Sequence, residues 1–283
     1  MGKAWAGELR ALWNAPVWAV VSGVGLVSFL TVSRIWLAGA EYGVVDSSVA
    51  SLTQPAAALR ASAWQISTLL GLLLTGVLVA TTLGQALEGG TWSMLRLHEH
   101  RVSRLLFRKA GAVLLALLTA QLMTAVLLCM GVILLSRIFP IQSRVGAHGN
   151  RVPSPTSADV VTWGEAAAAV ASTMLVQILF VAMTACAAAL LRSVIGTLAL
   201  GLGPILVTSP LVLLPVAPLL PQRWVADLLG LPSEAQFQLY FWNQAPPDPD
   251  PAIGGLALAA SAVLLMAAAW HLLRSERSLK PVD

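Results

Sequence analysis

Six long stretches without a charged residue alternate with short polar segments along the chain. They cover residues 11–33, 61–87, 110–136, 166–191, 193–222 and 251–273. Each is longer than the roughly 20 residues that a helix needs to cross about 30 Å of hydrocarbon. Their Leu, Ala, Val and Gly residues show no two-residue alternation, so the pattern predicts helices rather than barrel strands. We therefore predict an all-α, polytopic membrane protein whose six transmembrane helices lie at about 16–38, 63–87, 110–136, 164–191, 194–218 and 252–273.

Composition supports the same class of protein. Hydrophobic residues make up 57% of the 283 and charged residues only 11%, whereas a soluble domain carries about 25% charged residues. The connections between the apolar stretches are too short for a separate catalytic domain, so we expect one transmembrane domain over residues 1–283. The first stretch exceeds the usual core of a signal peptide, and we interpret it as a retained anchor.

The basic residues predict the orientation of the spans. With six spans, eleven of the seventeen Lys and Arg residues lie on the side that holds both termini, and the remaining six are diluted by acidic residues on the other side. The positive-inside rule then places both termini in the cytoplasm of a multi-pass protein of the cell membrane. The eleven are Lys3, Arg10, Arg96, Arg101, Arg104, Arg108, Lys109, Arg192, Arg274, Arg277 and Lys280.

The segments between the spans have patterns of their own. Residues 3–14 place Trp5, Leu9, Leu12 and Trp13 on one helical face, which predicts an interfacial elbow helix ahead of the first span. The connections 39–62, 137–162 and 219–252 are expected to be loops with at most short helices. A re-entrant hairpin within 219–252 is left open.

The chain lacks the motifs of familiar catalytic sites. It has no Gly-x-x-x-x-Gly-Lys-[Ser/Thr] loop for a nucleotide and no His-Glu-x-x-His motif for zinc. We therefore expect that it is not an enzyme by itself, carries no cofactor or metal and binds no nucleic acid. His98-Glu99-His100 lies among arginines that would repel a cation, so a solvated surface is the better interpretation of that cluster. Cys129 and Cys186 are expected to be small buried hydrophobic residues.

Several uncharged polar residues fall inside the apolar stretches. Gln121 and Thr124 lie in the third and Gln177 and Thr184 in the fourth. Two interpretations remain open, a path for a substrate or hydrogen bonds between helices.

The segment 88–109 is the largest polar feature between spans on the side of the termini. As a helix from about Thr91, it would align Arg96, His100, Arg104 and Arg108 at four-residue intervals. A second, apolar face would contain Trp92, Leu95, Val102 and Leu106. Physical chemistry alone favours a basic amphipathic helix that rests on anionic lipid.

The same segment resembles the membrane subunits of ABC exporters of the type-2 permease family. The similarity lies in an acidic residue followed by Gly-Thr after the second span, a Leu-rich stretch, a Val-Ser-Arg and a Lys that opens the third span. Here these are Glu88, Gly90, Thr91, Leu95, Leu97, Val102, Ser103, Arg104 and Lys109. Further similar pieces are Glu8-Leu9-Arg10 through Pro16, Leu191-Arg192-Ser193 through Gly203, Leu231-Pro232-Ser233 and the basic tail from Leu273. In outline the resemblance covers the whole chain.

The resemblance implies a function. Two such permeases, identical or related, would associate with two separate ATPase subunits, which would carry ATP and Mg. The segment after the second span would couple ATP-driven closure to the spans through Glu88, Gly90, Thr91, Trp92, Leu95, Arg96, His100, Arg104 and Arg108. One alternative is a membrane-anchored recruitment or sensory subunit that transports nothing. Another is an ion-coupled carrier, which the absence of carboxylates within the spans disfavours.

Overall fold

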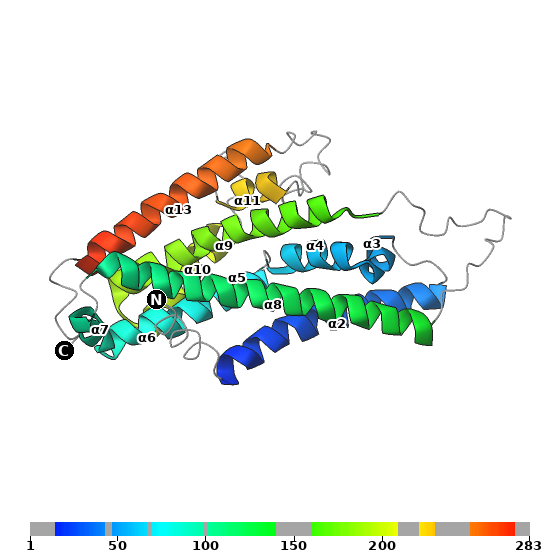
Figure 1. The fold of residues 1–283 in the computed structure, drawn as a ribbon, viewed down its shortest axis with the longest axis horizontal. Helices are drawn as coiled ribbons and strands as arrows, with labels where there is room; N and C mark the ends of the chain where they lie inside the picture. The colour runs from blue at the N-terminus through cyan, green and yellow to red at the C-terminus, as the bar shows by residue number, and fades with distance from the viewer. Residues whose placement is uncertain are drawn as a thin grey trace. The chain divides into compact units, whose positions relative to one another are not determined.

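The computed structural model describes residues 15–42, 47–66, 69–98, 101–139, 160–208, 221–229 and 250–274. Within these ranges the ordered elements are all helical (Figure 1). The predicted elbow at residues 3–14 lies outside the described residues, as do most of the connection 137–162 and the basic tail.

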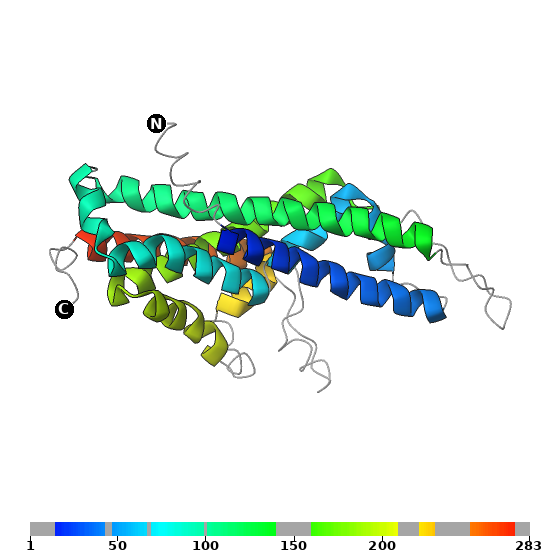
Figure 2. The same cartoon turned by 90° about the horizontal axis from the view of Figure 1, so that it is seen from below.

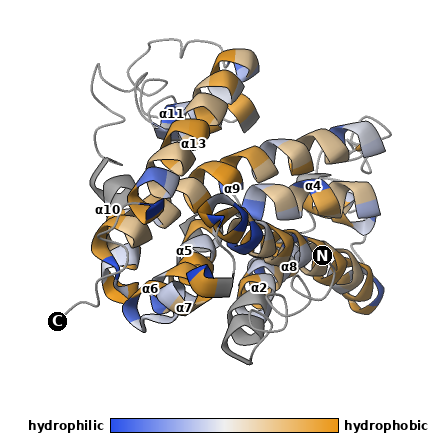
Figure 3. Ribbon diagram, turned by 60° about the vertical axis from the view of Figure 1, so that its left-hand side comes forward, coloured by the Kyte–Doolittle hydropathy of each residue, from blue (hydrophilic) through white to orange (hydrophobic). Residues whose placement is uncertain are grey.

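Four helical segments are long and apolar enough to cross a membrane. They are Gly71–Glu88, α8 (Val102–Ile138), α9 (Trp163–Leu191) and α13 (Pro251–Arg274). Residues Ser22–Ala38 of α2 (Ala15–Tyr42) form a shorter apolar helix, and α10 (Val194–Thr208) has 15 residues. Figure 3 shows hydrophobic residues over much of α8, α9 and α13. The prediction of a helical membrane protein is confirmed at this level.

The helices fall into two compact units, each assembled from separate parts of the chain. Among the residues described, one unit takes in 72–116 and the parts of the chain from 172 onward. The other contains 15–71 and 117–171. The helices α8 and α9 each contribute one part to one unit and the other part to the second unit.

The second of these units is organised by α2 and the later part of α8. A Cβ atom added at Gly25 would lie 2.8 Å from Leu127 Cδ1, and one at Gly131 would lie 2.2 Å from the Phe29 ring. The two helices thus approach closely because each presents a glycine to the other. The indole N–H of Trp36 donates a hydrogen bond to the carbonyl of Phe139 (3.4 Å).

The connection after α2 contains more helix than the sequence predicted. Its elements are α3 (Ser47–Ala50), the 3-10 helix η1 (Ser51–Thr53) and α4 (Pro55–Ile66). Leu52 packs with Trp36 and Val132, and Ala56 packs with Ala166. The 12-residue α4 begins at a proline, whose missing N–H costs nothing in the first turn of a helix.

The first unit has its core between the second, fourth and last apolar segments. The segment 69–88 consists of α5 (Leu69–Val79), the π-helix η2 (Ala80–Gly84) and α6 (Gln85–Glu88). Leu72, Val176, Phe180, Leu258 and Ala262 are buried together in this core. Apolar side chains from three helices therefore hold this unit together.

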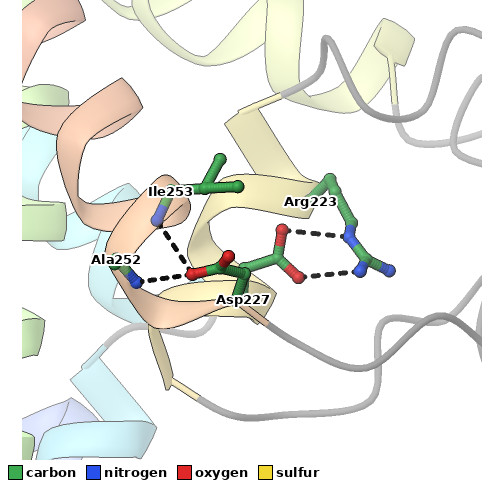
Figure 4. A network of polar contacts seen from close by, with 5 residues as sticks. Arg223, Asp227, Ala252 and Ile253 are labelled. Atoms are coloured by element: carbon green, nitrogen blue, oxygen red, sulfur yellow. Dashed lines mark hydrogen bonds and ion pairs between the residues drawn. The ribbon is translucent and has the colours of Figure 1, made fainter.

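The connection 219–252 contributes a short amphipathic helix, α11 (Pro221–Leu229), which packs against the start of α13. A Cβ atom at Gly254 would lie 2.6 Å from the carbonyl oxygen of Trp224, so glycine permits this close approach. Figure 4 shows the Arg223 guanidinium against the Asp227 carboxylate, with Nε 3.0 Å from Oδ2 and Nη2 2.9 Å from Oδ1. The Asp250 carboxylate caps α13 by accepting hydrogen bonds from the Ala252 and Ile253 N–H groups (3.0 and 3.1 Å). Residues 230–249, which any re-entrant hairpin would require, lie outside the described residues.

Candidate functional site

The candidate site is the turn at the end of α6, where the chain leaves the apolar segment. Gly90 has a φ of +68°, a left-handed conformation that glycine adopts without steric cost. The Gly89 N–H donates to the Gln85 carbonyl (2.9 Å), and the Thr91 hydroxyl donates to the Ala86 carbonyl (3.2 Å). These bonds end one helix and begin α7 (Thr91–His98) within a few residues.

The Glu88 carboxylate connects this turn to α10, which is distant in sequence. Its Oε2 accepts a hydrogen bond from the Val194 N–H (2.8 Å), at the first residue of α10. The Ser193 hydroxyl oxygen accepts from the Gly196 N–H (2.9 Å) at the same helix end. A carboxylate at a helix N-terminus satisfies an unbonded N–H group and interacts favourably with the helix dipole. Glu88 thereby joins the end of α6 to the start of α10.

The turn before α10 is tight enough to need an unusual backbone conformation. Arg192 adopts a φ of +50° between α9 and α10. A non-glycine residue in this region carries a steric cost, which the hydrogen bonds of Glu88 and Ser193 offset. A Cβ atom at Gly196 would lie 2.6 Å from Ser193 Oγ, so a larger residue there would displace the Ser193 cap.

The π-helix next to the turn also contacts α10. A Cβ atom at Gly84 would lie 3.3 Å from Thr197 Oγ1 and 3.5 Å from Val194 Cα. Such π-helical segments are frequent at functional sites. The buried Lys109 ammonium donates to a carbonyl of this π-helix, that of Thr82 (3.2 Å).

The predicted coupling residues do not form one continuous helix. Arg101 is not helical, and α8 begins at Val102, so Arg96 lies on α7 whereas Arg104 and Arg108 lie on α8. The prediction of one helical face through Arg96, Arg104 and Arg108 is therefore wrong, because α7 ends at His98 and α8 begins as a separate helix at Val102. His100 lies outside the described residues.

The other coupling residues occupy distinct environments. The Trp92 side chain is 1% exposed, and its indole N–H has no hydrogen-bond partner among the residues described. Leu95 and Arg96 are half-buried, and Arg104 is exposed. The expected apolar face of α7 is thus confirmed at Trp92, while the roles of these residues in coupling stay predictions.

The four polar residues proposed for a substrate path fall in two units. Gln177 accepts a hydrogen bond from the Thr75 hydroxyl, and the Thr184 hydroxyl donates to the Phe180 carbonyl (2.6 Å) within its own helix. Gln121 and Thr124 belong to the other unit. Both are fully buried, and their side-chain polar atoms have no partner in the described part of the chain. The bond from Thr75 favours an interhelical role for Gln177.

Sequence reasoning missed two residues of the site. Lys109 was expected only to open the third span, yet it bonds to the π-helix of the second. Ser193 was named only as part of the family resemblance at Leu191-Arg192-Ser193, and in the structure its hydroxyl caps α10. A serine directly before an apolar helix is a recognisable capping signal, whereas no sequence signal locates a π-helix.

Cys129 and Cys186 are not among the residues that bond at this turn. Cys129 and Cys186 are free thiols and only half-buried, and the Cys129 thiol lies 3.6 Å from the Thr53 carbonyl. Within the described ranges no group of three or more His, Cys, Asp or Glu residues could hold a metal ion. Glu99 and His100 are outside those ranges.

Comparison of the chain with family models, with curated proteins and with solved structures finds no match.

Proposed function

We propose that this chain is the transmembrane subunit of an ATP-driven ABC exporter. In this proposal six spans form the substrate pathway, with both termini in the cytoplasm of the cell. Two copies, or this chain and a related permease, associate with two ATPase subunits that bind ATP and Mg. The elbow, the first and fifth spans and the orientation are part of the proposal.

The observation that carries the proposal is the hydrogen bond from the Val194 N–H to Glu88. A short amphipathic helix at the end of an apolar segment is a suitable docking element for a cytoplasmic partner. Displacement of α7 would act through the turn at Gly90 on Glu88 at the end of α6 and, through the cap, on α10. In this proposal Glu88 is the mechanical connection between α7 and α10.

The Lys109 bond supports the same mechanism. It joins the start of α8 to the carbonyl of Thr82 in the π-helix, and Gly84 of that π-helix packs on α10. The helices on either side of α7 are therefore both bonded near the contact between the π-helix and α10. Glu88 at the end of α6 bonds to α10, and Lys109 of α8 bonds to the π-helix. A helix that merely rests on lipid would not require these bonds.

The test uses the chain purified from its native membrane together with any ATPase that co-purifies, reconstituted in liposomes. The readout is the change in ATPase rate that the permease causes. Glu88→Gln removes the negative charge that favours the cap of α10. Arg104→Lys keeps a positive charge near the start of α8 but removes the planar guanidinium group, which a Lys ammonium does not replace. Each variant should reduce the permease-dependent change by about tenfold, the effect of losing a charge-assisted bond of about 1.4 kcal/mol.

Matched controls are available among residues 117–171, which belong to the other unit. Glu165 forms a capping box with Thr162 at the start of α9, with Thr162 N to Glu165 Oε2 at 3.0 Å, so Glu165→Gln alters a comparable cap. Arg137 lies in the last turn of α8, and Arg137→Lys is the second control. Both controls should keep full coupling. If no ATPase co-purifies, or if Glu88→Gln and Arg104→Lys also keep full coupling, the chain is a recruitment subunit or a carrier and the proposal is wrong.

A further inference from the structure

An apolar groove runs along the outside of the first unit. It has a volume of about 460 Å³ and lies between α8, α9 and α13. Its lining includes Phe107 of α8, Ile178 of α9 and Val263, Ala267 and Trp270 of α13. We propose that this groove binds one acyl chain of an anionic glycerophospholipid from the surrounding bilayer. The proposal requires only that these helices cross a membrane and does not depend on the ABC exporter assignment.

The groove opens to the surroundings of the unit rather than to its core. Phe107 is 62% exposed and Val263 is 68% exposed, although both are large and apolar. Large exposed apolar patches are rare on proteins in water and mark contact with lipid or with another protein. All three helices that form the groove are among those long and apolar enough to cross a membrane. Lipid is therefore the medium that the groove meets.

The length of the groove matches one leaflet of a bilayer. From Ala259 to Trp270, which both line the groove, the helix α13 rises by about 16 Å at 1.5 Å per residue. This is close to half of the roughly 30 Å hydrocarbon thickness. An acyl chain of one leaflet therefore matches the groove in length.

Positive charge is concentrated at one end of the groove. The Arg274 guanidinium lies 5.5 Å from the centroid of the Trp270 ring. Figures 1 and 2 show the last turn of α13 beside the first turns of α8. There Ser103 lines the groove, and its neighbour Arg104 is exposed. Residues 101–116 and 263–274 contain no Asp or Glu.

This distribution of residues matches a lipid lying in its leaflet. Tryptophan is favoured at the level of the headgroups, with its apolar body toward the hydrocarbon. Arginines at the same level attract anionic headgroups. An acyl chain in the groove would place its phosphate near Arg274 and Arg104, which explains why the lipid should be anionic.

The test uses the full chain in nanodiscs that contain either phosphatidylglycerol or phosphatidylcholine with a photoactivatable group on the acyl chain. Crosslinked peptides are identified by mass spectrometry. We expect crosslinks within 258–270 of α13 and 103–107 of α8, with more from phosphatidylglycerol than from phosphatidylcholine. Arg274→Gln should lower the excess by about fivefold, the effect of one basic residue near an anionic surface. Arg137→Gln, at the opposite end of α8, should leave it unchanged.

A matched pair on α13 tests the groove itself. Ala267 and Ala268 are consecutive and both exposed, but only Ala267 lines the groove. Ala267→Trp should lower the crosslinking by about tenfold, equivalent to about 1.4 kcal/mol and within the range for overpacking. Ala268→Trp should not lower it.

Three results would overturn the proposal. Equal crosslinking in the Ala267→Trp and Ala268→Trp variants would show that the groove holds no acyl chain. Equal crosslinking by phosphatidylglycerol and phosphatidylcholine would show that the groove does not select an anionic headgroup. Crosslinks from α13 to a second copy of the chain, in place of lipid, would identify the groove as a protein interface.

Discussion

Buried polar side chains in this protein are of two kinds. Gln177 and Thr184 use their polar atoms in hydrogen bonds, one to another helix and one within a helix. Gln121 and Thr124 are equally buried, but their polar atoms have no partner in the described part of the chain. A buried amide without a partner loses its hydrogen bonds to water and gains nothing in return. Replacing each glutamine by leucine should therefore have opposite consequences.

Gln177→Leu should lower the free energy of unfolding by about 1 kcal/mol, the scale of interhelical hydrogen bonds in membranes. Gln121→Leu should leave it unchanged or raise it, because it removes an unpartnered amide. The measurement is unfolding by SDS in mixed micelles, followed by tryptophan fluorescence. The double variant Thr75→Val with Gln177→Leu is the control, because it should cost less than the sum of the two single variants. Equal losses for Gln121→Leu and Gln177→Leu would contradict this account.

At the scale of elements, helices of this protein approach one another at glycine. The hairpin of α9 and α10 is the clearest case, because a Cβ atom at Gly201 would lie 2.5 Å from Thr184 Cγ2. Gly203 lies on the same helix, and a Cβ atom there would meet no atom of the described residues within 4 Å. Small residues at helix contacts allow the backbones to approach, which is a main source of packing energy between helices in lipid. The two glycines provide a matched comparison.

Gly201→Leu should destabilise the protein by about 1–3 kcal/mol, the cost of forcing extra methylenes into a packed site. Gly203→Leu should be neutral or slightly stabilising, because leucine favours a helix more than glycine does. Thermal unfolding in detergent would measure both changes. A similar loss of stability in both variants would mean that helix packing at Gly201 is not the cause.

For the whole molecule, the membrane topology is the property that remains to be tested. The described residues contain four helices long and apolar enough to span, whereas the distribution of Lys and Arg predicts six spans. The two counts differ partly because α2 and α10 are described only in part. A labelling experiment can decide between them.

Single cysteines at Ser103 and Ser278 should react with an impermeant maleimide only from the cytoplasmic side. Cysteines at Ser48 and Ser154 should react only from the outside. The single cysteines are introduced into a variant in which both native cysteines, Cys129 and Cys186, are replaced by serine. Labelling of positions 154 and 278 from the same side would contradict the six-span topology, which places three crossings between them, whereas the four candidate spans place only two.

Much of the helical architecture was predictable, because long apolar stretches have few alternatives in lipid. Helix boundaries agree closely for the last span, predicted at 252–273 and observed at Pro251–Arg274. The segment 88–109 was predicted less well. Periodicity predicted one helix from Thr91, whereas α7 ends at His98 and α8 begins at Val102. A local pattern cannot reveal where one helix ends and the next begins when both are amphipathic.

The sequence by itself determined that the chain is helical and where its apolar segments lie, since backbone groups in hydrocarbon must be bonded within each helix. It also identified Glu88, Gly90 and Thr91 as the start of a distinct polar segment. Only the tertiary structure decided which groups these residues meet. Glu88 caps α10 across 106 positions of sequence, Lys109 bonds to a π-helix, and Gln177 has a partner where Gln121 has none. The physical reason is that hydropathy depends on the residue itself, whereas a hydrogen bond between distant residues depends on how the helices pack.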